Sequence, residues 1–396
     1  MLSLHLESEN EKDYSFSDIY AQTIAYSLFT ARVFSYVQDQ RQGNPKETLF
    51  DRESAWQQLP ETNPFLRRLF QDVSERSSDE LGDELIGAIA EIFTILRAAK
   101  MDVILQDFRE KQNRKDIVIH FYESFLDAYK QEMRERRGVY YTPESIVSYM
   151  VKSVDYILRK DFSLADGLAD ASKIQYRQAN SKESRETHKV LITDVAAGTG
   201  TFLHGVIDHI YRSFDHNSAD WSDYVAKDLL PRLLGFELLM APYAVAHMKL
   251  GLQLLESGYK FNTPERLRVF LTNTLQEAFQ IPSADGYDSW FRDEANAANA
   301  VKEKAPVMVI LGNPPYSGVS ENTGNWIHEL LRGKDILNHQ PTQSYFEVDG
   351  KPLNERKHWL NDDYVKFIRF GQWRIEQTGY GVLAFITNHE IGRAHV

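Results

Sequence analysis

Pro306-Val-Met-Val-Ile-Leu-Gly-Asn-Pro-Pro-Tyr316 is the stretch of sequence that decides the fold. Its apolar run at 307–311 predicts a buried central strand. Pro314 and Pro315 end that strand, because proline neither continues a helix nor donates to a sheet ladder. The strand tip therefore carries the amide of Asn313 and the ring of Tyr316 in a stiff segment. An amide beside a ring suits a flat amine such as a nucleobase, and a plain proline-stiffened loop is the alternative.

Composition excludes several classes of protein. The 396 residues are 42% hydrophobic and 26% charged, which is typical of a soluble globular protein of one large or two smaller domains. The chain has no cysteine, so it has no disulfide framework and no thiolate metal site, which fits a reducing cytosol. The most apolar helical stretch, at 85–99, is interrupted by Glu91 and is too short to span a bilayer. We expect no membrane association.

Charge argues against general coating of nucleic acid, because the net charge is −12. Two local basic clusters remain, and each is either a solvated surface or a track for phosphates. The first comprises Lys130, Arg134, Arg136 and Arg137, and the second comprises Lys351, Arg356, Lys357, Lys366 and Arg369.

The order of elements predicts an α/β fold. Helical periodicity dominates residues 15–130, which we interpret as an appendage for packing or docking. Strands and helices then alternate, which predicts a parallel sheet with right-handed crossovers and helices on both faces. The predicted strands are 190–193, 233–236, 268–271, 307–311 and 381–387, and the predicted helices are 201–214, 242–255 and 365–377.

Polar side chains follow four of these strands. Asp194, Glu237, Asn273 and Asn313 each stand where a predicted strand ends. Ligands of parallel α/β sheets bind at the carboxyl ends of the strands. We therefore expect these four side chains to converge on one cleft.

The loop after the first of these strands predicts a close approach of ligand to backbone. Gly198-Thr-Gly200 permits that approach, but Leu203 occupies the position of the third glycine of a dinucleotide fingerprint. Glu237 can accept from both hydroxyls of a ribose, or it can be a charge near the start of the next helix. Together these features predict a pocket for a nucleoside-bearing ligand without a pyrophosphate.

One further segment carries a helix start. Thr142-Pro143 combines a hydroxyl cap with proline at the first helical position, and the helix runs to about Lys160. Its N-terminus can either contact an anionic ligand group or simply be capped. The histidines His204, His209 and His247 do not have the spacing of a metal site, so we expect no metal.

In their order along the chain, Thr142-Pro143, residues 194–202, Glu237 and Asn313-Pro-Pro-Tyr316 resemble the amino-group DNA methyltransferases, in the gamma arrangement of adenine-N6 enzymes. A wider likeness is to the methyltransferase segment of type ISP or IIG single-chain restriction–modification proteins. The segments that carry it are Ala21-Gln-Thr-Ile-Ala-Tyr26, Gly138 to Pro143, Gly312 to Gly318, Ser344 to Gly350 and Asp363 to Phe370. Val195 stands where that family often has proline.

The resemblance implies a Rossmann-like methyltransferase sheet, S-adenosyl-L-methionine as cofactor and double-stranded DNA as partner. Tyr316 would stack on a flipped adenine, while the Asn313 amide oxygen and the Pro314 carbonyl would accept its N6 hydrogens. The residues implied for catalysis are Asn313, Pro314, Pro315 and Tyr316. Those implied for the cofactor are Tyr141, Thr142 and Pro143 at its methionine end, Asp194 at its amino-acid moiety with Phe202 packed beside it, Ala197, Gly198 and Gly200 in the close-approach loop, Glu237 at the ribose and Asn273 near the adenine.

Two alternatives remain open. A methyltransferase that modifies a glutamine side-chain amide in protein also uses Asn-Pro-Pro-Tyr, and a non-catalytic DNA-docking fragment of a larger polypeptide would retain the same motifs. The Tyr140-Tyr-Thr-Pro143 segment, the helical appendage and the insertion at 317–362 favour DNA.

The expected organisation is a helical N-terminal region at 1–135 and a catalytic domain at 136–389. The tail Glu390-Ile-Gly-Arg-Ala-His-Val396 resembles translated sequencing adapter, so we expect residues 390–396 to be non-native. In the gamma order a target-recognition domain would follow the last catalytic strands, so we expect a C-terminally incomplete chain. Nuclease or helicase domains would belong to the full polypeptide. The expected location is the cytoplasm of a prokaryote, on DNA.

Overall fold

Parallel strands form the centre of the molecule. The computed structural model describes residues 16–43, 50–76, 82–104, 142–177, 184–214, 218–261, 263–277, 289–316, 320, 322–337, 340–353 and 358–387. Within them, the central sheet has the order β11-β6-β3-β4-β5, and every neighbouring pair in it is parallel. Its strands are β3 (Ile192–Asp194), β4 (Leu233–Glu237), β5 (Arg268–Leu271), β6 (Val309–Gly312) and β11 (Val382–Phe385).

Helices cover both faces of this sheet, as alternation along the strands requires. In β4, Leu233 belongs to one buried cluster and Leu234 to the other; Val309 and Ile310 of β6 divide in the same way. The first cluster lies under α8 (Glu144–Lys160), α9 (Thr201–Tyr211) and α11 (Met240–Glu256). The second lies under α12 (Ser289–Lys304), α13 (Asn325–Leu331) and α14 (Asp363–Thr378). The predicted α/β fold is confirmed.

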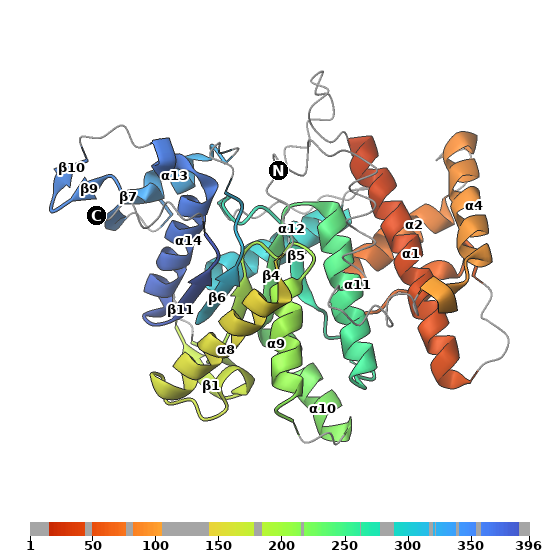
Figure 1. Ribbon diagram of the computed structural model, residues 1–396. Coiled ribbons are helices and arrows are strands. Elements are labelled where there is room, and N and C mark those ends of the chain that lie inside the picture. Colours follow the sequence, from red (N-terminus) through yellow and green to blue (C-terminus); the bar gives the residue numbers. More distant parts are fainter. Residues whose placement is uncertain are drawn as a thin grey trace.

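The helical N-terminal region shares the core of the sheet. It contains α1 (Phe16–Gln42), α2 (Pro64–Glu75) and α4 (Asp83–Ala98), with a 3-10 turn at Ala55–Gln58, and lies beside α11 (Figure 1). Phe34 of α1 packs so closely on Gly251 that a Cβ there would lie 3.0 Å from the ring. The Leu267 amide donates to the carbonyl of Thr62 at 2.9 Å. These contacts join the helices to the β5 side of the sheet.

Shorter elements occupy the end of the molecule opposite the N-terminal helices, the segment between α8 and β3, and the segment between α9 and β4 (Figure 1). The segment between α8 and β3 contains an antiparallel pair of strands. These elements are β1 (Lys173–Tyr176), β2 (Arg185–His188), α10 (Ser218–Tyr224), β7 (Arg332–Asp335), β8 (Gln340–Ser344), β9 (Glu347–Val348) and β10 (Lys351–Pro352), with short turns of helix at Gly167–Ala169, Val225–Leu229, Leu230–Arg232 and His358–Asn361.

Two helix starts differ from the sequence prediction. α8 begins at Glu144 with Pro143 in the N-cap position and no side-chain cap, so the prediction that Thr142 caps this helix is wrong. α11 begins at Met240 rather than Pro242, which brings its N-terminus closer to Glu237. In the described ranges, no helix has both the length and the apolar character needed to cross a membrane.

Part of the second predicted basic cluster is buried. Lys366 and Arg369 are both 0% exposed on α14. Arg369 donates to the Leu330 carbonyl at 3.2 Å, and Lys366 forms an ion pair with Asp363 at 3.7 Å. Neither side chain belongs to a solvated surface or to a phosphate track, because both complete the packing of α14.

Asp155 provides a test of how α8 is anchored. It accepts from the Leu168 amide at 2.8 Å and from Arg159 Nε at 2.7 Å, and lies 3.4 Å from His209 Nε2. Burial alone would raise the pKa of Asp155, but the hydrogen bonds from His209, Arg159 and Leu168 outweigh burial and hold the pKa at about 2.

We expect Asp155→Asn to lower the free energy of unfolding by about 1–2 kcal/mol at pH 7. Because the pKa of Asp155 is depressed on folding, the stabilisation is present above pH 4 and disappears as pH falls towards 2. Denaturant unfolding of wild type and variant measures this difference. The same change at Asp102, an exposed residue, is the control and should have little effect. A difference that does not depend on pH would contradict the role of the carboxylate.

Candidate active site

The order of strands places a cleft between β3 and β6. The chain builds outwards from β3 in one direction through β4 and β5, and in the other through β6 and β11. Such a switch point leaves a crevice at the carboxyl ends of the two central strands. Asp194 ends β3 and pairs with Gly235 and Leu311, so Glu237 and Asn313 each stand two residues beyond its level on the adjacent strands.

Asp194 is a fully buried carboxyl group at this point. Its Oδ1 accepts from the Ala196 amide at 3.1 Å, while Oδ2 has no hydrogen-bond partner among the described residues. Burial raises the pKa of Asp194 to about 7; the hydrogen bond from Ala196 lowers it and the charge of Glu237 raises it. Buried polar atoms nearly always have a partner, so this oxygen indicates a place for a ligand donor.

Glu237 connects the second strand to the glycine loop. Its Oε2 accepts from the Gly198 amide at 2.8 Å, and its Oε1 accepts from the Leu239 amide at 2.7 Å. Burial raises the pKa of Glu237 to about 7, against the effect of hydrogen bonds from Leu239 and Gly198. Leu239 is the N-cap residue of α11, so the carboxylate also serves that helix start. Each carboxylate oxygen keeps a second lone pair for another donor.

The loop between β3 and α9 requires glycine at two positions. Gly198 has φ +53° and Gly200 has φ +77°, which are strained for any other residue. A Cβ on Gly198 would meet nothing within 4 Å, so this side of the loop is open. Ala197 donates its amide to the Phe236 carbonyl at 2.9 Å. Phe202 is 3% exposed and packs in the core cluster that lies beneath α9.

Asn313 stands at the end of β6 with its two amide atoms in different surroundings. Nδ2 donates to Thr142 Oγ1 at 3.1 Å, whereas Oδ1 is buried and has no partner in the described part of the chain. Pro314 is buried, and Pro315 and Tyr316 are half-buried. The Tyr316 ring packs against a small cluster that includes Tyr364.

The structure joins Asn273 to the segment after Tyr316 rather than leaving it open to a ligand. Asn273 Oδ1 accepts from the Leu275 amide at 2.9 Å, and Nδ2 donates to Asn322 Oδ1 at 2.8 Å. Asn322 Nδ2 donates to Asp363 Oδ2 at 2.9 Å, and Lys366 Nζ donates to the Asn322 carbonyl at 2.5 Å. These hydrogen bonds were not predicted from the sequence, although residues 363–370 are part of the family likeness.

The remaining predicted site residues have less defined surroundings. Pro143 is exposed at the start of α8, and Tyr141 lies outside the described residues. Within the described ranges, no three His, Cys, Asp or Glu side chains are grouped in a way that could hold a metal ion.

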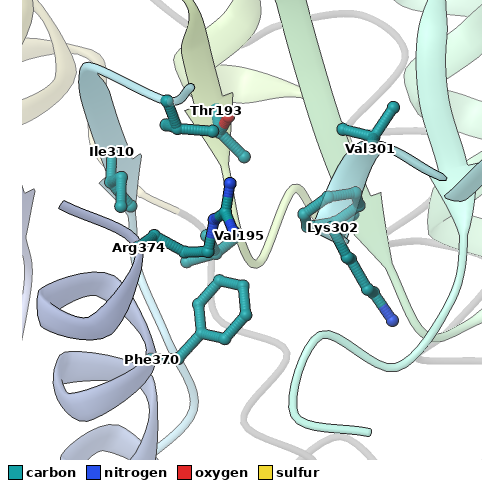
Figure 2. Close-up of a pocket in the computed structure, with 9 residues that line it drawn as sticks. Thr193, Val195, Val301, Lys302, Ile310, Phe370 and Arg374 are labelled. Atoms are coloured by element: carbon teal, nitrogen blue, oxygen red, sulfur yellow. The ribbon is translucent and has the colours of Figure 1, made fainter. Parts of the chain in front are cut away.

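A separate cavity lies on the α12–α14 side of β3 and β6 (Figure 2). Arg374 points into it, and the Lys302 amine points away, towards Thr272 Oγ1 at 2.7 Å and the Asn273 carbonyl at 2.6 Å. Burial lowers the pKa of Lys302 to about 7 and that of Arg374 to about 10. None of the predicted site residues lines the cavity. The residues that line it are Thr193, Val195, Phe236, Val301, Lys302, Val307, Ile310, Phe370 and Arg374.

The buried carboxyl of Asp194 gives a prediction for the ligand-free protein. Because the pKa rises on folding to about 7, the folded state loses stability as pH rises from about 4 to 7. Asp194→Asn removes the buried charge and lets Oδ1 keep its bond from Ala196. We expect the variant to be more stable than wild type at pH 8, by about 2–4 °C or more in Tm. The gain should shrink towards pH 5 in thermal unfolding, and an equal gain at both pH values would contradict the explanation.

The model of the N-6 DNA methylase family matches residues 113–340. Among solved structures, the DrdV–DNA complex is 21% identical, covers 94% of this chain and 30% of that chain, and has a TM-score of 0.57. A nuclease-deletion mutant of the type ISP restriction–modification enzyme LlaGI, bound to a DNA substrate mimic, is 17% identical, covers 98% and 30%, and has a TM-score of 0.55.

The ATP-dependent type ISP restriction–modification enzyme LlaBIII, bound to DNA, is 19% identical, covers 94% of this chain and 22% of that chain, and has a TM-score of 0.55. The chain thus spans less than a third of each of these three proteins. A search of proteins of curated function finds no match. The structural likeness supports the fold, and the family match covers more than half of the sequence. The predicted family is confirmed: the chain belongs to the N-6 DNA methylases.

Proposed function

We propose that this protein transfers the methyl group of S-adenosyl-L-methionine to N6 of an adenine flipped out of double-stranded DNA. The observation that carries the proposal is a pair of buried oxygens that have no partner among the described residues: Oδ1 of Asn313 at the β6 end and Oδ2 of Asp194 at the adjacent β3 end. One oxygen can accept from a target amine and the other from a cofactor ammonium. Membership of the N-6 DNA methylases favours this function over methylation of protein glutamine.

The residues at the strand ends fit the proposed cofactor. Glu237 would accept from the ribose hydroxyls with the lone pairs that Gly198 and Leu239 leave free. Asp194 would accept from the amino group of the methionine moiety, and the open side of the loop at Gly198 allows close approach. When bound there, the cofactor supplies an electrophilic sulfonium methyl group. Asn273 is a weaker candidate for adenine contact, because its side-chain atoms already bond to Leu275 and Asn322.

The chain's own groups would position the acceptor. Base flipping costs a few kcal/mol of stacking and pairing, which stacking on Tyr316 would offset in part. Asn313 Oδ1 and the Pro314 carbonyl would accept the two N6 hydrogens and direct the nitrogen lone pair towards the methyl group. Positioning and preorganised acceptors lower the barrier without an initial proton transfer to a general base.

A methylation assay with DNA and protein acceptors side by side tests the function. We expect isotopically labelled methyl groups to appear on DNA as N6-methyladenine, identified by mass spectrometry, and not on protein glutamine. Asn313→Ala should lower turnover by at least about 100-fold, because it removes an acceptor for the reacting amine. Its Kd for the cofactor should change by less than about threefold. Near-normal turnover in this variant, or labelling of protein alone, would show the proposal to be wrong.

The raised pKa of Glu237 predicts how cofactor affinity depends on pH. The group is protonated below about pH 7 in the ligand-free protein, and the ionised form accepts more strongly from the ribose hydroxyls. Affinity for S-adenosyl-L-methionine should therefore increase from pH 6 to pH 8 in calorimetric titrations. Glu237→Gln should weaken binding by about 10–100-fold at pH 8.

The Gln variant should also lose part of the pH dependence, because it cannot ionise. Asp194→Asn is the matched comparison, since Asp194 also titrates near pH 7. If Glu237→Gln bound the cofactor with wild-type affinity at pH 8, Glu237 would not be a cofactor-binding residue.

The biological setting is part of the same proposal. The solved structures named above are restriction–modification enzymes bound to DNA, or a DNA complex. We propose that this chain likewise provides the modification activity of a restriction–modification protein acting on prokaryotic DNA. Residues 136–389 would form its catalytic domain, and residues 1–135 would form its helical N-terminal region, in which α1 packs against α11.

A further inference from the structure

We propose that Thr142 is a positioning residue that holds the side-chain amide of Asn313 in place for the target base. This inference rests on the proposed function and extends it, because the resemblance placed Thr142 at the cofactor instead. The observation is the hydrogen bond from Asn313 Nδ2 to Thr142 Oγ1, 3.1 Å long between residues 171 apart in sequence. Thr142 is 6% exposed, and the bond is partly buried.

The orientation of the amide decides whether the site can work. The two ends of an Asn side chain have opposite hydrogen-bonding character, and the terminal torsion has only a broad, roughly two-fold preference. With the oxygen towards the adenine, Asn313 accepts an N6 hydrogen. With the nitrogen there, two donors would face each other. In the structure Thr142 accepts from Nδ2, and Oδ1 is buried without a partner among the described residues. A hydroxyl can donate as well as accept, so Thr142 restrains the amide in either orientation, and the N6 hydrogens of the target base select the oxygen end.

Thr142 is well placed to restrain the amide. Its side chain makes no cap bond to α8, so its hydroxyl is not engaged by that helix start. Its backbone is restricted because proline follows, and its side chain is stiff at χ1 because it is β-branched. The helix after it is anchored: a Cβ on Gly205 of α9 would lie 2.7 Å from Val147 of α8. A hydroxyl group on a restrained segment therefore contacts the catalytic amide from a separate element.

The test compares Thr142→Val, which keeps the shape and removes the acceptor, with Thr142→Ser, which keeps the acceptor. In the full chain we expect Thr142→Val to lower kcat for DNA methylation by about 10–100-fold. The calorimetric Kd for S-adenosyl-L-methionine should remain within about threefold of wild type. Thr142→Ser should restore most of kcat. Thr94→Val, which removes an exposed hydroxyl on α4, is the control for loss of a threonine hydroxyl elsewhere.

Two results would overturn the inference. A Thr142→Val variant with weakened cofactor binding and normal kcat at saturation would make Thr142 a cofactor ligand. A variant with kcat and Kd both unchanged would make the hydrogen bond irrelevant to catalysis.

A double-mutant comparison of stability tests the contact without any activity. Thr142→Val should lower Tm by about 2–4 °C in the wild-type background and have little effect in the Asn313→Ala background. Equal shifts in both backgrounds would overturn the inference, because the two side chains would then be independent. If the coupling is present but wild type methylates neither DNA nor protein, the proposed function fails while the Thr142–Asn313 contact is supported.

Discussion

The parallel pairing of β3 with β6 is the constraint on which the site depends. In this register Asp194 is level with Leu311, so Asp194 occupies the last paired position of β3 and Asn313 lies two residues beyond that level. A slip of one residue would turn every side chain of β6 to the opposite face of the sheet. The apolar residues of β6 prevent such a slip, because Val309 and Ile310 are committed to different core clusters. Packing on both faces of the sheet thus determines the geometry of the polar cleft.

The buried carboxyl groups of this cleft lower the stability of the folded protein. Asp194 and Glu237 are both buried, and burial raises the pKa of each to about 7. Ionised carboxyl groups in such a place oppose folding until a ligand supplies donors, so binding energy and folding energy are linked. The well-packed helices on both sides compensate. This distribution, with a well-packed frame and buried carboxyl groups at the strand ends, is expected where function requires preorganised polar groups.

The elements that could be predicted from sequence are those with local signals. The β5 strand at 268–271 matches the structure, and the strands ending at Asp194, Glu237 and Asn313 are correct to within about two residues. What could not be predicted depends on contacts between distant segments. Nothing local shows that Thr142 contacts Asn313 instead of capping α8, or that Lys366 is buried. Charge patterns report composition, whereas burial of a charged side chain depends on partners that only the folded chain brings together.

Those distant contacts also link the two halves of the site. From the β5 end, Asn273 donates to Asn322, which donates to Asp363 at the start of α14. Lys366 completes the chain by donating to the carbonyl of Asn322 and pairing with Asp363. Asn322 follows the Asn-Pro-Pro-Tyr segment in sequence, so this network restrains the chain on the C-terminal side of the proposed base-binding segment. The Thr142–Asn313 hydrogen bond restrains the amide of Asn313, the first residue of that segment. Elements that border the proposed cofactor pocket therefore restrain the tetrapeptide from both sides. This restraint is a physical reason for the cofactor and the target base to bind in a fixed position relative to each other.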